Sequence, residues 1–510
     1  MRGALLGLLL VGACSSSVEE ANERTSAAAA LFDAGNYEEA HKAITEANAA
    51  RDDIADQYLL QGRIELGLRR IDNAFVAYSR ALELDPSSQE ALQFTAEYYL
   101  RSGQIAAAER AADSSLALDP RAMRSLLIKG LIALERRDPK NALAIADQLL
   151  KINPADSEGL ILKSRALAKG GDYDAARKLL ENRQPSGERP ENIILATMAI
   201  NRASGNLPGL LADFEAILPR MPDNDDLRID FANTLYKSGD TARARRVLLM
   251  LLRKRGDQRD TLSRIVALWR EYDPDPIDKE QLTRIAADGA DATRLTVARY
   301  LFSTHRIPAA QALLSPAQIN GGGEAAGFYA RLLDARGETA KAARIVTAIL
   351  AKDTNNADAL LLRSDMFLRK RKFREAVNDA QIVVRDFPES EEGYIALAKA
   401  LVLKGESWRA RQIFETGLNT LPQNLALVSK FSDFLFVIDD KKRAMSAVRI
   451  FTDTNPASLR GWDLLASVCA RLEDKDCASR AAAGRIRALT IYAIDERPGT
   501  QHYRNLLGRL

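Results

Sequence analysis

Apolar side chains between residues 391 and 422 form two helical stripes separated by a glycine. Tyr394, Leu397 and Leu401 lie three or four positions apart, so they share one face of a first helix. Gly405 then interrupts the pattern, as is common where a helix ends. The second stripe runs to Pro422, whose ring nitrogen has no hydrogen to donate to a helix. The segment predicts a hairpin of two antiparallel helices.

This hairpin pattern repeats along almost the whole chain with a period of about 34 residues. An alanine recurs in the second stripe, and in many copies a proline follows it twelve positions later, as at Pro86 and Pro120. One slot holds Leu210, and the series is irregular on both sides of Ala310. A fixed period of this length is typical of stacked helical hairpins, so the sequence predicts an all-α solenoid. The recurring alanines are Ala40, Ala74, Ala108, Ala142, Ala176, Ala244, Ala310, Ala342, Ala376, Ala410, Ala444 and Ala478.

A second small residue lies twelve positions before several of these alanines. The two helices of a hairpin are expected to cross most closely there. A larger side chain would push them apart at roughly 1–3 kcal/mol. The pairs are Gly62 with Ala74, Ala96 with Ala108, Gly130 with Ala142, Ala232 with Ala244, Ala398 with Ala410 and Ala466 with Ala478.

With these motifs the chain resembles the tetratricopeptide repeat family. Residues 78–86 (YSRALELDP) are similar to the second half of that family's motif, and Trp462, Leu465 and Ala466 are similar to the first half. The similarity covers residues 21 to about 490, or about fourteen units. It implies a right-handed α-solenoid whose first helices line a concave groove for an extended peptide or a helix of another protein.

The resemblance also implies which side chains face this groove. In the family, the second, fifth, ninth and twelfth positions of each first helix point into it. Counting from the alanine series gives an apolar rail flanked by charges of both signs. The predicted groove residues are Leu59, Arg63, Glu97, Leu127, Arg165, Ile229, Asn233, Tyr236, Leu361, Asp365, Ile395, Lys399, Asp433 and Phe436.

Breaks in the repeat divide the chain. The segments 271–282 (EYDPDPIDKEQL) and 315–324 (SPAQINGGGE) have prolines or glycines and no clear small pair, and we interpret both as joints. The predicted organisation is a signal peptide (1–13), a tether (14–22), an N-terminal array (23–256), degenerate units with a joint (257–323), a C-terminal array (324–490) and a capping tail (491–510).

The N-terminus, MRGALLGLLLVGAC, reads as a short secretory signal. Its apolar run is shorter than the ~20 residues of a transmembrane helix. The end of the run resembles the bacterial lipobox, which implies that Cys14 becomes a lipidated N-terminus. Ser15 is not the aspartate that retains such proteins at the inner membrane in the enterobacterial version of that family, which favours an outer-membrane lipoprotein facing the periplasm. An ordinary signal with a chance cysteine is the alternative.

The other two cysteines, Cys469 and Cys477, flank the expected turn of the last hairpin. Their side chains are expected to face each other, so either a disulfide or two buried thiols would fit. The bacterial periplasm supports disulfides, and a bridge would pin a hairpin that lacks a neighbour on one side. Two cysteines without a nearby histidine are too few ligands for zinc.

Composition excludes several function classes. The chain has 72 basic and 69 acidic residues, so its formal charge of +3 predicts no nucleic-acid binding and no strong attraction to a membrane surface. No nucleophile, phosphate-loop, dinucleotide or zinc-protease motif is visible, and we expect neither enzymatic activity nor a cofactor. Two basic clusters could contact an anionic polymer or lipid headgroups, or could stabilise helix C-termini. They are Arg243, Arg245, Arg246, Arg253, Lys254 and Arg255, and Arg369, Lys370, Arg371, Lys372 and Arg374.

Three functions fit this sequence. The first is a scaffold for other proteins in an envelope export or assembly complex, for example one for exopolysaccharide secretion, attached to the membrane only through acyl chains. The second is a periplasmic module that binds or guides polysaccharide. The third is a cytoplasmic adaptor without a signal. Polysaccharide tracks usually need exposed aromatic residues. The chain has only three tryptophans, Trp269, Trp408 and Trp462, and each fits a repeat-core position about as well as an exposed one, which favours the first function.

Overall fold

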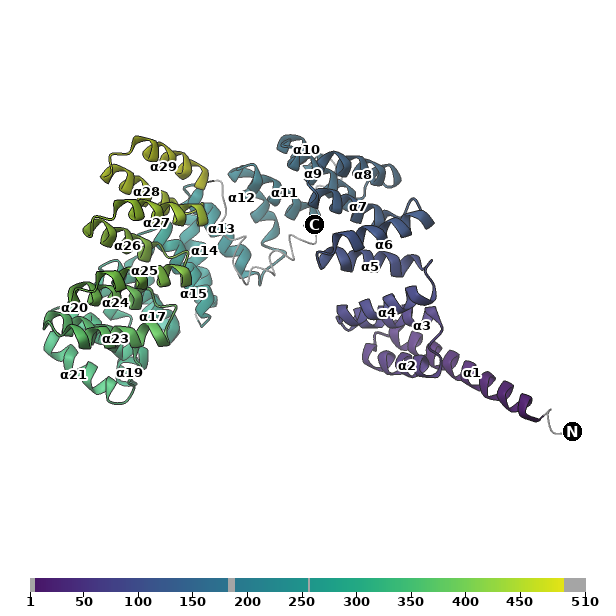
Figure 1. Cartoon of the computed structure of the whole chain (residues 1–510), viewed down its shortest axis with the longest axis horizontal. Helices are drawn as coiled ribbons and strands as arrows, with labels where there is room; N and C mark the ends of the chain where they lie inside the picture. The colour runs from purple at the N-terminus through teal and green to yellow at the C-terminus, as the bar shows by residue number, and fades with distance from the viewer. Residues whose placement is uncertain (1–4, 182–188, 256, 490–510) are drawn as a thin grey trace. The chain divides into compact units, whose positions relative to one another are not determined.

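The computed structural model describes the backbone of residues 5–181, 189–255 and 257–489, and the side chains of these ranges from Val18 onward. These residues form 29 α-helices and no strand. Successive helices pair as antiparallel hairpins (Figure 1). The all-α repeat fold predicted from the alanine series is therefore confirmed.

The chain divides into two compact units, one ending at Ile200 and the other beginning at Asn201. The helices of the first unit are α1 (Leu5–Asp33), α2 (Tyr37–Ala50), α3 (Ala55–Gly67), α4 (Ile71–Leu84), α5 (Gln89–Arg101), α6 (Ile105–Leu118), α7 (Met123–Glu135), α8 (Pro139–Ile152), α9 (Ser157–Lys169) and α10 (Tyr173–Glu181), followed by most of α11 (Glu191–Ala203). The segment boundaries taken from the sequence, at 256 and 323, stay predictions.

The second unit continues the hairpins. Its first part contains α12 (Leu207–Ile217), α13 (Asp225–Lys237), α14 (Thr241–Lys254), α15 (Arg259–Tyr272), α16 (Lys279–Asp288), α17 (Asp291–Ser303), α18 (Ile307–Ala312) and α19 (Pro316–Asn320). The regular part contains α20 (Gly323–Ala335), α21 (Thr339–Leu350), α22 (Ala357–Arg369), α23 (Phe373–Asp386), α24 (Glu391–Lys404), α25 (Ser407–Thr420), α26 (Leu425–Val437), α27 (Lys441–Thr454), α28 (Leu459–Arg471) and α29 (Lys475–Ala488).

The irregular alanine intervals correspond to shortened second helices. α16 has 10 residues and α18 has 6, against 14 in most second helices. The glycine-rich segment is shorter than the sequence suggested. Ser315 and Gln318 form a capping box that starts the additional helix α19, and only Gly321 and Gly322 separate it from α20.

The small residues at the helix crossings are buried, as expected, except in the last hairpin. Ala398 and Ala410 have no exposed surface, and neither does Leu210 in its slot. In contrast, Ala466 and Ala478 are both exposed, so this predicted pair is wrong. The inner face of α29 is shifted by one residue and consists of Cys477, Ala481, Gly484 and Ala488. This shift places Cys477 against α28, to which it is bonded.

The hairpin turns share one conformational requirement. A residue with positive φ recurs at most turns, one repeat period apart in the regular copies, and it is often glycine, as at Gly405 (φ 90°). Arg371 and Asp439 occupy the same place with φ of 56° and 58°. The turn geometry is thus kept even where an L side chain makes it less favourable.

Candidate functional site

In the first unit, two of the predicted groove residues, Arg63 and Glu97, form ion pairs between successive first helices. The guanidinium of Arg63 on α3 donates from Nε to Glu90 on α5 at 2.8 Å. Between the next two first helices of the array, Arg124 on α7 donates from Nε to Glu97 on α5 at 3.0 Å. Both pairs join the ninth position of one first helix to the second position of the next, 27 residues later. The ninth position is basic in the first pair and acidic in the second. We name the pairs Arg63–Glu90 and Glu97–Arg124 the ladder.

These pairs are partly solvated. The hydrogen bond from Arg63 lowers the pKa of Glu90, against the effect of burial, and Tyr78 adds a second hydrogen bond at 2.9 Å. Leu59 and Leu127 are partly buried and pack against the hydrophobic core beside the ladder. Arg165 on α9 is also partly buried, and burial lowers its pKa, opposed by Glu135.

In the second unit, three predicted groove residues are not accessible. Ile229, Asn233 and Tyr236 on α13 are exposed by only 2, 5 and 6%. Tyr236 stacks on Tyr272 with ring centroids 5.3 Å apart, and its hydroxyl donates to Asp273 at 3.1 Å. Most residues of α13, on all its faces, are buried. These three residues therefore belong to the interior in this structure, which corrects their prediction as an open groove.

The predicted groove residues of α22, α24 and α26 either pack in hydrophobic clusters or form accessible ion pairs. Leu361 is buried and Ile395 is half-buried, both in hydrophobic clusters. The ninth-position residues are accessible and paired: Lys399 Nζ lies 2.8 Å from Asp365.

Asp433 and Phe436 share one partner on α28. Arg471 Nη1 lies 3.1 Å from the Asp433 carboxylate, and its guanidinium lies 3.5 Å from the centroid of the Phe436 ring. The structure therefore brings these two predicted groove residues together under one arginine.

A charge cluster that was not predicted from the sequence lies on the first helices α17, α20, α22 and α24, with the buried Asp358 at its centre. Arg299 and Arg331 both donate to Asp358, at 3.0 and 2.7 Å, and Arg331 also donates to Glu392 at 2.6 Å. Burial would raise the pKa of Asp358, but the two guanidinium groups outweigh it and hold that pKa below its usual range. Arg331 stands at a ninth position and Glu392 at a second position. Counting from Ala342 and Ala410 places both residues on the groove face, but it does not predict their contact.

The second unit also contacts itself over long sequence distances. Glu271, near the end of α15, accepts from the backbone N–H of Arg460 at 2.9 Å and from the Ser458 hydroxyl at 3.3 Å. These groups form the N-terminus of α28. Lys237, at the end of α13, donates to the Ala488 carbonyl at the end of α29 at 3.1 Å. An anion thus meets a helix N-terminus and a cation meets a helix C-terminus, and both contacts match the helix dipoles.

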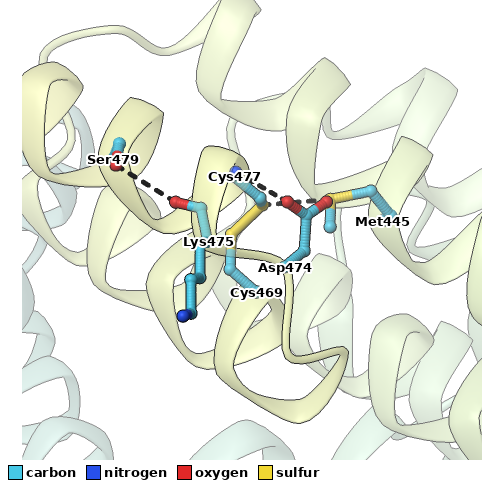
Figure 2. Close-up of a disulfide and its surroundings, with 6 residues drawn as sticks. All are labelled: Met445, Cys469, Asp474, Lys475, Cys477 and Ser479. Carbon is cyan, nitrogen blue, oxygen red and sulfur yellow. Dashed lines mark hydrogen bonds between the residues drawn. A yellow bond between two sulfur atoms is a disulfide. The ribbon is translucent and has the colours of Figure 1, made fainter.

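Cys469 and Cys477 are bonded to each other in the structure (Figure 2). Their Cα atoms lie 5.5 Å apart across the turn between α28 and α29, and both residues are buried. Asp474 accepts from the Cys477 N–H at 2.9 Å, and the Met445 sulfur lies 3.5 Å from the Cys477 sulfur. The bond therefore joins the last two helices beside α27. Cys14, the predicted lipidation site, lies outside the residues whose side chains are described.

The two basic clusters differ in their surroundings. In the first, Arg243 pairs with Glu215 at 2.5 Å, Arg245 with Asp273 at 2.6 Å and Lys254 with Asp223 at 2.9 Å. In the second, Arg369 pairs with Asp334 and Asp365 at 2.6 Å, but the other four side chains are exposed and have no ion pair among the described residues. The first cluster is mainly structural, whereas much of the second faces solvent.

Among the described side chains, carboxylates that line an open cavity are held in ion pairs. An open cavity of about 520 Å³ lies between the starts of α13 and α15, and its carboxylates Asp225 and Asp226 are paired with Arg255 and Arg264. Within the same described ranges, no group of three or more metal-ligating side chains occurs. None of the described helices combines the length and the apolar character that crossing a bilayer requires.

Family models described as tetratricopeptide repeat match residues 25–89, 95–157 and 133–188. A comparison with curated protein sequences gave no match. Among solved structures, the chain is similar to a tetratricopeptide repeat protein from Parabacteroides merdae, with 16% identity over 49% of this chain and 98% of that chain (TM-score 0.41). It is also similar to PilW, described as a widely conserved type IV pilus biogenesis factor, with 20% identity over 41% and 96% of the two chains (TM-score 0.36). A third similar structure is a repeat protein of Thermus thermophilus, with 24% identity over 36% and 99% (TM-score 0.32).

Proposed function

Because the chain belongs to the tetratricopeptide repeat family, whose members generally mediate contacts between proteins, we propose that it is a non-enzymatic scaffold of the bacterial envelope. In this proposal the mature protein is an outer-membrane lipoprotein that faces the periplasm, anchored through acyl chains on Cys14. It holds a protein of an export or assembly complex, such as an exopolysaccharide secretion system, along its first helices. Several acyl chains would make this anchoring stable, since one chain alone binds only marginally.

The ladder of accessible ion pairs in the first unit is the observation that carries this proposal. Arg63 and Glu97 each pair with one residue of the next first helix, and Glu97 also pairs with Arg101 on its own helix at 2.6 Å. The side chains of Arg63 and Glu97 keep 49 and 27% of their surface exposed. A partner that carries both charge signs can replace one member of each pair without leaving a buried charge unpaired. Leu59 and Leu127 lie beside these charges and supply apolar contact. This lining fits an extended peptide or a helix.

Site-specific photo-crosslinking in intact envelopes tests the proposal. A benzophenone side chain at position 127 is expected to crosslink one protein in good yield. The same group at Leu118, which is 51% exposed at the end of a second helix, serves as the matched control. The partner so identified should lose about tenfold in affinity for the Glu97→Lys variant, since reversing one charge at an interface commonly costs about 1.4 kcal/mol or more. No crosslinked protein from positions 59, 127 and 395 would reject the groove as the binding surface.

Metabolic labelling with palmitate tests the anchoring separately. Label is expected in the natural chain and absent from the Cys14→Ala variant. A natural chain without label would exclude acylation at this residue and would favour the cytoplasmic adaptor, whereas label of equal strength in the variant would place the acyl group at another residue.

A further inference from the structure

The turns of three successive hairpins in the second unit lie along one edge of the array. They are residues 369–374 between α22 and α23, 403–409 between α24 and α25, and 437–443 between α26 and α27. The preceding first helices lie side by side near these turns, since Lys399 on α24 contacts Asp365 on α22 at 2.8 Å. α24 and α26 also pack against each other. In Figure 1, α24 and α26 follow one another along this stack. We name these three segments the turn edge.

The turn edge carries a strong positive charge. It contains 10 basic residues and 3 acidic ones, whereas the whole chain has a formal charge of only +3. Five of the cations have ion pairs within the unit, as Lys404 has with Glu406 at 2.7 Å. The other five are exposed and have no ion pair among the described residues. They are Lys370, Arg371, Lys372, Arg374 and Lys442. Solvation of these five side chains leaves them available to an anion.

Large apolar side chains are exposed between these cations. Trp408 is 61% exposed, Leu403 is 49% exposed and Val437 is 80% exposed, and Ile438 lies beside Val437. Leu403 and Val437 occupy the same repeat position in consecutive units, so they lie on successive hairpins. Trp269 in the same unit has no exposed surface, although Met250, Ile450 and Ile486 of this unit are also exposed outside the turn edge. The tryptophan, the aliphatic side chains and the free cations are thus gathered on one edge.

We propose that the turn edge binds the surface of an anionic phospholipid membrane. Lysine and arginine are attracted to phosphate headgroups, tryptophan prefers the interface between headgroups and acyl chains, and aliphatic side chains enter the outer part of the apolar layer. An acidic polysaccharide would use the cations, and could stack on Trp408, but it offers no apolar layer for Leu403, Val437 and Ile438. The combination therefore favours a lipid surface. This contact is separate from acylation at Cys14 and from binding along the first helices.

Vesicle co-sedimentation of the full chain with Cys14→Ser tests the proposal, because no acyl chain can then contribute. We expect binding to vesicles of phosphatidylethanolamine with about one third phosphatidylglycerol, and little binding to vesicles of phosphatidylcholine alone. Binding to the anionic vesicles should fall as salt rises from 0.05 to about 0.5 M, because the Debye length falls from above 10 Å to a few Å. Equal binding to both vesicle types, or none to either, would overturn the proposal.

Tryptophan fluorescence locates the contact. Trp408 is the exposed tryptophan, while Trp269 and Trp462 are 0 and 4% exposed. Anionic vesicles should therefore shift the emission to shorter wavelength in the natural sequence and leave it unchanged in Trp408→Phe. A shift that persists in Trp408→Phe would place the membrane contact elsewhere and reject the turn edge.

Matched substitutions separate charge from folding. The triple change of Lys370, Lys372 and Lys442 to Gln should weaken vesicle binding about a hundredfold, since each cation near an anionic surface contributes about fivefold. The same change at Lys151, Lys352 and Lys430, which are exposed outside the turn edge, should have less than a threefold effect. Likewise Val437→Ala should weaken binding severalfold, and Val76→Ala, at a side chain 66% exposed in the first unit, should not.

Each triple variant should keep the helical content and thermal midpoint of the parent, because the changed side chains are exposed. Equal effects of the two triple changes would overturn the proposal. So would tight, salt-sensitive binding to an acidic polysaccharide without binding to vesicles, which would assign the turn edge to a polymer.

Discussion

The carboxylate of Glu271 lies 2.9 Å from the backbone nitrogen of Arg460, although 189 residues separate them. The same carboxylate accepts from Ser458, the N-cap of α28, and the Arg460 guanidinium donates to the Arg270 carbonyl at 2.5 Å. A side chain on α15 therefore completes the capping of a helix near the other end of the array. The second unit closes on itself through this contact and the contact between Lys237 and Ala488. The buried residues Ile229, Asn233 and Tyr236 belong to the same helix as Lys237.

Replacing Glu271 with Gln should loosen the start of α28. Glutamine keeps an acceptor oxygen but loses the negative charge that the helix N-terminus favours, a loss of about 1 kcal/mol. Amide hydrogen exchange at Arg460 and its neighbours is expected to accelerate by about fivefold. Glu280→Gln is the control, because Glu280 is exposed on α16 and pairs only with Arg284 four residues away. Equal exchange in both variants would mean that Glu271 does not stabilise this closure.

The stability of the second unit should rise with pH above neutrality because of Lys237. Burial lowers the pKa of this lysine to about 8, an effect that Asp230 and Glu271 oppose and Arg202 reinforces. Relative to the unfolded chain, the folded state therefore favours the neutral amine. The free energy that the folded state loses by holding a charged Lys237 becomes smaller as pH rises from about 8 towards 10.5. From pH 7 to 9.5 the expected gain in the free energy of unfolding from this group is about 2 kcal/mol.

Chemical denaturation of the natural chain and of Lys237→Met at both pH values measures this contribution. The gain specific to Lys237 is the difference between the two proteins, since all other titrating groups are shared. An identical pH dependence in the two proteins would contradict the prediction.

Removing the buried carboxylate of Asp358 should destabilise the second unit strongly. Its side chain is 3% exposed and neutralises both Arg299 and Arg331, so Asp358→Ala removes the nearest carboxylate of Arg299 and leaves the buried Arg331 with Glu392 alone. We expect a loss of about 3–5 kcal/mol in the free energy of unfolding. Asp365→Ala breaks the accessible pairs with Lys399 and Arg369 and should cost less than about 1 kcal/mol. Urea denaturation of both variants measures the difference, and similar losses would refute the ranking.

Replacing the small residue at a helix crossing with leucine should destabilise one hairpin and leave the stability of another nearly unchanged. Ala398 has no exposed surface, so Ala398→Leu must separate α24 from α25 at about 1–3 kcal/mol. Ala466 stands at the equivalent repeat position but is exposed, and Ala466→Leu should change the stability by less than about 0.5 kcal/mol. Thermal unfolding of the two variants gives the comparison. A large loss in Ala466→Leu would mean that the last hairpin keeps the common register.

Much of the fold was predictable because the repeat is local. The alanine at each helix crossing, the positive φ at the turn represented by Gly405 and the approach of Cys469 to Cys477 all depend on contacts within one hairpin. The contact of Asp365 with Lys399 could also be predicted from the repeat, because both residues stand at the ninth position of adjacent units.

Two of the missed contacts join hairpins that are not neighbours. Arg331 contacts Glu392 across two units, and Glu271 contacts Arg460 across most of the second unit. No period in the sequence marks such a pair, because the small rotation between hairpins must accumulate before distant helices meet. The sequence also left open whether Trp408 is exposed, because its place in the repeat fits a buried position equally well.

The sequence by itself determined the repeating hairpin, because helix spacing, small crossing residues and turn residues act within a single repeat. Only the tertiary structure decided which repeat positions are accessible. The burial of Tyr236 and the closure by Glu271 depend on how many rotated units separate two helices. The one-residue shift of α29 depends on whether a hairpin has a following neighbour.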